Sequence, residues 1–97
     1  MQVRDIVIKK GKQVAQGIEI PLQNSTLVLV VAKKGYIMCG YLDIATADKF
    51  DDCACVVRGV SSVDELLKSK VVEVSSKAKK SGIKIGMLAN NALGVLS

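Results

Sequence analysis

The chain has 97 residues, which is the size of one domain, and 14 lysines and arginines against 9 acidic residues give it a net charge of +5. It contains no histidine, so a Ser-His-Asp triad, a Cys-His dyad and an HExxH zinc site are excluded within this chain. Hydrophobic residues make up 49% and aromatic residues only 3%, so we expect a core of Val, Ile, Leu and Ala.

The first 42 residues predict an antiparallel meander of four strands. Turns are expected at Lys10-Gly11-Lys12 and Lys34-Gly35, with Pro21 at the end of the second strand. These strands carry more apolar side chains than one covered sheet face requires, so we expect a second copy of the chain to cover the other face. The strands are expected over residues 3–9, 13–20, 26–33 and 36–42.

The remaining residues predict alternating helices and strands. Asp43 is placed to cap a short helix, and a capping pattern at Ser61 and Ser62 predicts one helix over about 62–81 that ends at Gly82. Strands at 53–58 and 83–85 and a helix at 89–96 complete the pattern. The fold class is therefore a single α+β domain over 1–97, with the meander at 1–42 and β-α-β-α-β units at 43–97.

The cysteines indicate a reducing compartment. Cys39, Cys53 and Cys55 are an odd number and follow no signal peptide, so we expect free thiols, buried as small apolar groups, in the cytoplasm. The longest apolar run, 27–32, is far shorter than the roughly 20 residues of a membrane helix. The C-x-C spacing is not that of a zinc site, so neither a metal nor another cofactor is expected.

The cations are almost all lysines. Arginine occurs only as Arg4 and Arg58, so the other twelve of the 14 cations are lysines, scattered along the sequence. Scattered lysines are typical of a solvated surface, whereas specific nucleic-acid readers favour arginine and aromatic residues. Nucleic acid is therefore not expected among the partners, and non-specific nucleic-acid binding is an alternative that depends on charge alone.

Several short motifs occur in order along the chain: Cys39-Gly40-Tyr41-Leu42-Asp43, Arg58-Gly59-Val60, Asp64-Glu65-Leu66-Leu67, Gly82-Ile83, Gly86-Met87 and Ala92-Leu93. Together they resemble the YunC-like domain family, a small family of archaea and bacteria whose function is unknown. The resemblance covers most of residues 30–93 and implies an N-terminal β region that forms tetramers. After Gly86-Met87 the chain has Ala89, Asn90 and Asn91, where the family continues with Gly, Arg and Glu, so no role of that Arg or Glu carries over.

The sharpest cluster of candidate site residues lies at strand ends. If the strands at 36–42, 53–58 and 83–85 are parallel, the loops that follow them open on one sheet edge, where α/β folds bind ligands. Arg58 and the N-terminus of the next helix would then hold a small anion, a carboxylate or a phosphate. The same residues are also typical of ordinary turns and caps. The candidate ligand-binding residues are Gly40, Asp43, Arg58, Gly59, Ser61, Ser62 and Met87.

Three functions follow from these features. The leading hypothesis is a homo-oligomeric protein, most simply a tetramer, that serves as a non-catalytic scaffold or binds a small anion. The second is a cysteine-dependent enzyme centred on Cys39, with Asp43, water or a lysine as the base and with Arg58 or a helix terminus stabilising the thiolate. The third is the non-specific nucleic-acid binder.

Overall fold

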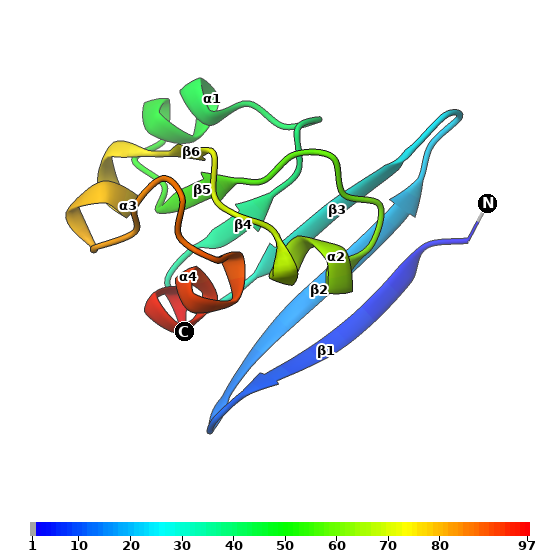
Figure 1. Ribbon diagram of the computed structural model, residues 1–97, viewed down its shortest axis with the longest axis horizontal. Coiled ribbons are helices and arrows are strands. Elements are labelled where there is room, and N and C mark those ends of the chain that lie inside the picture. Colours follow the sequence, from blue (N-terminus) through cyan, green and yellow to red (C-terminus); the bar gives the residue numbers. More distant parts are fainter. Residues whose placement is uncertain (1) are drawn as a thin grey trace.

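The computed structural model describes residues 2–97 as one six-stranded sheet with four helices (Figure 1). The strands lie in sequence order. They are β1 Arg4–Lys10, β2 Gln13–Pro21, β3 Thr26–Val31, β4 Tyr36–Met38, β5 Ala54–Val56 and β6 Glu73–Val74. The helices are α1 Ile44–Lys49, α2 Val63–Lys68, α3 Ser76–Lys80 and α4 Ala89–Leu96.

The first four strands pair antiparallel with their neighbours, so the predicted meander is confirmed. The chain then crosses over through α1, and β5 joins β4 in parallel, while β6 closes the sheet antiparallel to β5. The α+β fold class is therefore correct. The strand register places alternate residues on opposite faces of the sheet.

The main core lies between one sheet face and helices α2 and α4. It is built almost entirely from aliphatic residues and cysteines, including Val28, Val30, Ile37, Leu66 and Leu93, all fully buried. On the opposite face, α1 covers only the β4–β5 part of the sheet, through a smaller cluster of Met38, Ala47, Ala54 and Val56. Within residues 2–97, that face of β1 and β2 therefore has no helix packed on it, and Leu29 of β3 borders the cluster under α1.

The single helix expected over 62–81 is wrong. Helix α2 ends at Lys68, because Ser69 is extended with ψ near 165°. The β-branched residues that follow bring the chain to the sheet edge, where Val74 pairs with Cys55. Ser75 then begins a new helix, α3, by accepting a hydrogen bond from the backbone N–H of Ala78.

The strand expected at 83–85 is also wrong. Ile83 is fully buried, and its N–H donates to the Ala78 carbonyl, which closes the end of α3. Ile85 is 67% exposed, and the nearest strand-like pairing is an isolated bridge between Lys70 and Leu88. This segment therefore returns the chain over the core and adds no strand to the sheet.

Other local predictions are confirmed. Asp43 caps α1 by accepting from the backbone N–H of Ala45, and the terminal helix occupies 89–96 as expected. Cys39, Cys53 and Cys55 are free and buried. Among residues 2–97, no helix has the length and apolarity needed to cross a lipid bilayer.

Candidate functional site

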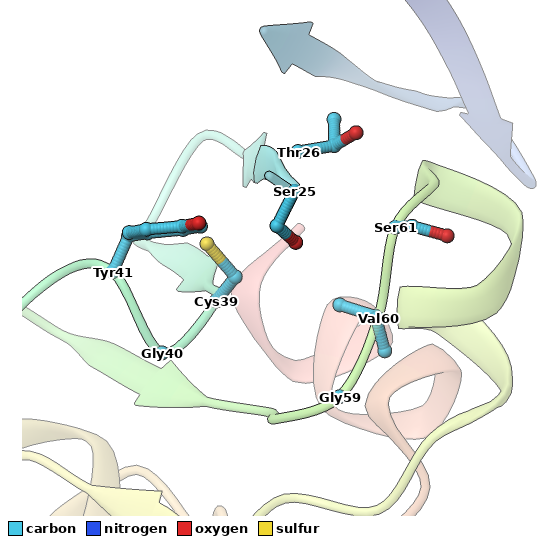
Figure 2. Close-up of a pocket in the computed structure, with 8 residues that line it drawn as sticks. All are labelled: Ser25, Thr26, Cys39, Gly40, Tyr41, Gly59, Val60 and Ser61. Atoms are coloured by element: carbon cyan, nitrogen blue, oxygen red, sulfur yellow. The ribbon is translucent and has the colours of Figure 1, made fainter. Parts of the chain in front are cut away.

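A pocket opens where β4 and β5 end. Because these two strands are parallel, the loops that follow them emerge at the same sheet edge. The turn before β3 completes the wall, since β3 runs antiparallel to β4. The pocket has a volume of about 450 Å³, and its lining residues are Ser25, Thr26, Cys39, Gly40, Tyr41, Gly59, Val60 and Ser61 (Figure 2).

Cys39 lies at the inner end of this pocket and is only 3% exposed. Its sulfur accepts a hydrogen bond from the backbone N–H of Val28 at 3.3 Å, and its own N–H donates to the Val28 carbonyl. Figure 2 shows the Cys39 sulfur and the Ser25 hydroxyl on the pocket side of their loops. The Ser61 hydroxyl instead points toward α2, where it donates to the Glu65 carboxylate.

Three of the predicted ligand-binding residues, Gly40, Gly59 and Ser61, line this pocket. Gly59 has φ of +73°, a backbone conformation that glycine adopts without strain. Arg58 lies beside them, because a Cβ on Gly40 would be 3.1 Å from its Nη1 atom. The Nη2 atom of Arg58 pairs with Glu73, which holds the guanidinium next to Gly40, although Arg58 is not among the residues that line the pocket.

The other three predicted residues serve the fold. Asp43 and Ser62 are the N-caps of α1 and α2. Met87 is half-buried against the main core, away from the pocket, because the strand that would have carried it to the sheet edge does not form. The pocket is thus built by the loops after two parallel strands, β4 and β5, and by the turn between β2 and β3. Three parallel strands were expected instead.

The N-terminus of α2 already has partners for its backbone donors. The Val63 N–H donates to Glu19, a residue of β2, and the Glu65 N–H donates to the Ser62 hydroxyl. The Ser61 N–H donates to the Glu65 carboxylate, so the residue just before the N-cap is also tied to the first turn of α2. The Val63 and Glu65 N–H groups of this helix are therefore used within the fold, and Arg58 lies next to Gly40 without lining the pocket itself.

Sequence reasoning missed four lining residues: Ser25, Thr26, Tyr41 and Val60. Tyr41 and Val60 directly follow Gly40 and Gly59 in the loops after β4 and β5, so their positions in the sequence could have identified them as lining residues. Ser25 comes from the β2–β3 turn and Thr26 begins β3, and only the antiparallel register of β3 with β4 brings them next to Cys39. No local pattern marks them.

The other two cysteines lie away from the pocket. Cys55 is fully buried in β5, and burial, followed by the nearby Cys53, raises the pKa of its thiol to about 12. The Cys53 sulfur lies 3.8 Å from the Ser81 hydroxyl. Within residues 2–97, no group of three or more acidic or cysteine side chains is arranged to hold a metal ion.

The comparisons with known proteins bear on this same part of the chain. Residues 38–96 match the model of a domain of unknown function, DUF1805. This chain belongs to that family. The matched range contains both loops that follow β4 and β5 and excludes most of the meander.

Two relatives extend the match to most of the chain. The chain is 34% identical over 80 residues to the uncharacterised protein YunC of Bacillus subtilis, covering 78% of this chain and 79% of YunC. It is also similar to the crystal structure of a protein of unknown function from Thermoplasma acidophilum, with 38% identity and a TM-score of 0.95. That match covers 99% of this chain and 94% of the other, so the fold is shared from end to end.

Proposed function

We propose that this protein is a homo-oligomeric, non-catalytic protein of the cytoplasm that binds a small ligand in the pocket at the ends of β4 and β5. The observation that carries the proposal is the meeting of two glycine-containing loops, Gly40-Tyr41 and Gly59-Val60, with the Ser25 turn around one open pocket. Glycines let a ligand approach the backbone closely, and the Ser25 hydroxyl and Tyr41 ring supply polar and apolar contacts.

An anionic group on the ligand would bind Arg58, which lies next to the lining residue Gly40. The Nη2 atom of Arg58 is paired with Glu73, while Nη1 lies over Gly40. A guanidinium has five N–H donors, so the pair with Glu73 leaves others for a carboxylate or phosphate. The uncharged lining then accommodates the rest of the ligand.

Nuclear magnetic resonance tests this site. Inorganic phosphate and acetate are titrated into the labelled protein, and we expect saturable shifts of the Gly40, Tyr41 and Gly59 amides. Arg58→Gln should weaken these shifts by at least tenfold in Kd, whereas Lys84→Gln, which removes an exposed cation from another turn, should not. Shifts spread over all lysine-rich turns, with no saturation at the pocket, would refute the anion site. Native mass spectrometry of protein from its own host would then identify the natural ligand.

The uncovered sheet face supports the oligomeric part of the proposal. In β2 the apolar side chains Val14 and Ile18 face away from the helices, whereas Ala15, Gly17 and Glu19 face them. On this outer face Val7 is 68% exposed and Val14 is 60% exposed. A second copy packed here would remove that apolar area from water, which is the ordinary driving force of association.

Light scattering coupled to size exclusion tests the assembly. We expect an oligomer, most simply a tetramer, and Val14→Glu should dissociate it while the circular dichroism spectrum is unchanged. Ile85→Glu is the matched control, because Ile85 is also exposed, at 67%, but lies far from β2 in the chain. A monomer at all concentrations, or equal dissociation by both substitutions, contradicts an interface on the N-terminal strands.

One contact favours a second candidate function, a cysteine-dependent enzyme. Cys39 lines the pocket, and the N–H that Val28 donates to its sulfur would stabilise a thiolate. Asp43, proposed as the base, is engaged in capping α1. Thiol labelling of the native protein against pH distinguishes the two: rapid labelling of Cys39 near neutral pH supports the enzyme, and labelling only after denaturation supports the binding protein.

A further inference from the structure

The lysines that are scattered in the sequence gather at one end of the folded sheet. Lys9, Lys10 and Lys12 surround the β1–β2 turn, and Lys33 and Lys34 form the β3–β4 turn. Because β1 to β4 alternate in direction, both turns lie at the same sheet end, opposite the pocket. In Figure 1 the β1–β2 turn lies at the bottom of the view and α3 at the left, both away from the β2–β3 turn at the upper right.

Helices α1 and α3 add four more lysines at this end, which we call the lysine end. The Cys53 carbonyl accepts from the Tyr36 N–H next to the β3–β4 turn, and the Cys53 sulfur contacts Ser81 at the end of α3. The two helices also meet each other, since Lys77 pairs with Asp51 at 3.8 Å. The added lysines are Lys49, Lys77, Lys79 and Lys80.

The charge of the molecule is therefore polarised. The lysine end has nine lysines and three carboxylates, a balance of +6, while the other five cations and six acids sum to −1. Each of the three carboxylates is already engaged: Asp48 accepts from the Ser76 N–H, Asp51 pairs with Lys77, and Asp52 accepts from the Tyr36 hydroxyl. Eight of the nine lysines form no ion pair with any residue in 2–97, the exception being Lys77.

An exposed aromatic ring stands among these cations. Phe50 is the C-cap of α1, between Lys49 and Asp51, and it is 70% exposed. A cationic surface with an exposed aromatic side chain is the combination that binds single-stranded nucleic acid: lysines contact phosphates, and a base stacks on the ring. We propose that the lysine end, with Phe50, binds single-stranded nucleic acid without sequence preference.

This surface is independent of the ligand pocket and uses none of its residues. Anionic lipid would also be attracted by the lysines, but only nucleic acid supplies a flat base for the Phe50 ring together with a repeated phosphate charge. With roughly five phosphate contacts, affinity should fall about 100-fold between ~50 mM and ~200 mM salt. The strength of binding and its salt slope are thus both set by the lysine end.

Fluorescence anisotropy with a labelled poly-dT oligonucleotide, and the matching poly-U, tests the proposal on the full chain. Lys12→Gln combined with Lys33→Gln should weaken binding and make the salt slope shallower by roughly 1.4. The control, Lys68→Gln with Lys84→Gln, makes the same change in net charge outside the lysine end and should leave the slope unchanged. Equal effects of both pairs would overturn the proposed surface.

Phe50 distinguishes stacking from charge alone. Phe50→Ala should weaken oligonucleotide binding about tenfold, and Ile85→Ala, at a similarly exposed apolar residue, should not. Both sites are exposed, and circular dichroism checks that both variants are folded. Three results overturn the proposal: no binding at low salt, a duplex of the same length bound as tightly as the single strand, or binding to phosphatidylserine vesicles in place of oligonucleotides.

Discussion

The Glu19 carboxylate accepts a hydrogen bond of 2.7 Å from the backbone N–H of Val63, across 44 residues of sequence. Glu19 is a residue of β2 and is only 6% exposed, while Val63 is the first residue of α2. Its other carboxylate oxygen accepts from Arg4 of β1. One side chain thus joins the first two strands to the helix that covers them, and it satisfies a backbone donor that the helix cannot.

Removing this carboxylate should destabilise the fold. Glu19→Ala leaves the Val63 N–H buried without an acceptor, so we expect the free energy of unfolding to fall by about 1–3 kcal/mol. Urea denaturation measures the loss. Arg4→Ala is the control, because the Arg4 side chain is 65% exposed and such ion pairs contribute about 0–1 kcal/mol. Equal losses for both variants would show that the hydrogen bond to Val63 contributes no more to stability than the exposed ion pair with Arg4.

Ser75 and Ser76 make a matched pair of adjacent serines. Ser75 is fully buried; its hydroxyl donates to the Asp52 carbonyl and accepts from the N–H groups of Ala54 and Ala78. Ser75→Ala should cost about 2 kcal/mol or more, since it removes a helix cap and leaves buried groups unpaired. Ser76→Ala, at an exposed site, should change stability by less than about 0.5 kcal/mol. Thermal unfolding of both variants checks the difference.

Two glycines should respond to alanine in opposite directions. A Cβ on Gly35 would lie 2.1 Å from the Cys53 carbonyl oxygen, so Gly35→Ala must separate β4 from β5 and should be severely destabilising. Gly94 lies within α4, and its nearest neighbour would be the Lys10 side chain at 3.6 Å. Gly94→Ala should therefore stabilise the protein, by about 0.5–1 kcal/mol. A tolerated Gly35→Ala would contradict the close approach of these segments.

Tyr36 should titrate late. Burial, then the hydrogen bond to Asp52 and its negative charge, raises the pKa of the Tyr36 hydroxyl to about 12, from an ordinary value of 10.0. Because the folded protein holds this proton more tightly, the contribution to stability is complete below pH 10 and is lost as pH rises toward 12. Asp52→Asn should lower the pKa, as measured by ultraviolet absorbance with Tyr36→Phe to identify the signal. An unchanged titration in Asp52→Asn would contradict this coupling.

Much of the fold could be predicted from local patterns. The β-branched runs and their turn residues predict the first four strands, and the Asp43 cap and the apolar spacing near the end predict α1 and α4. The segment after Lys68 could not be predicted this way. Val71 and Val74 fit a helical stripe as well as a strand, and only pairing of Val74 with Cys55 favours the strand. That pairing is a contact between distant residues, which local periodicity does not contain.

The candidate site was predictable only in part. The glycines that follow β4 and β5 were found because parallel strands send their loops to one edge, a rule that needs only strand positions. Ser25 was not found, because its place beside Cys39 depends on the β3–β4 register. The expected donors at the start of α2 were already used by Glu19 and Ser62, contacts that appear only when β2 and α2 pack together.

The sequence by itself determined the α+β class, the antiparallel meander, the aliphatic core with its buried cysteines, and the family. Apart from the family, which depends on the ordered motifs, these features depend on burial patterns and turn and cap residues that can be read within a few residues of sequence. The tertiary structure alone decided three matters: that Glu19 faces the helices while Val14 faces outward, where the helical segment is interrupted between α2 and α3, and that the turns and helices that carry most of the lysines share one end of the sheet. Each depends on which distant segments pack together, and that is determined by the sum of long-range contacts over the whole chain.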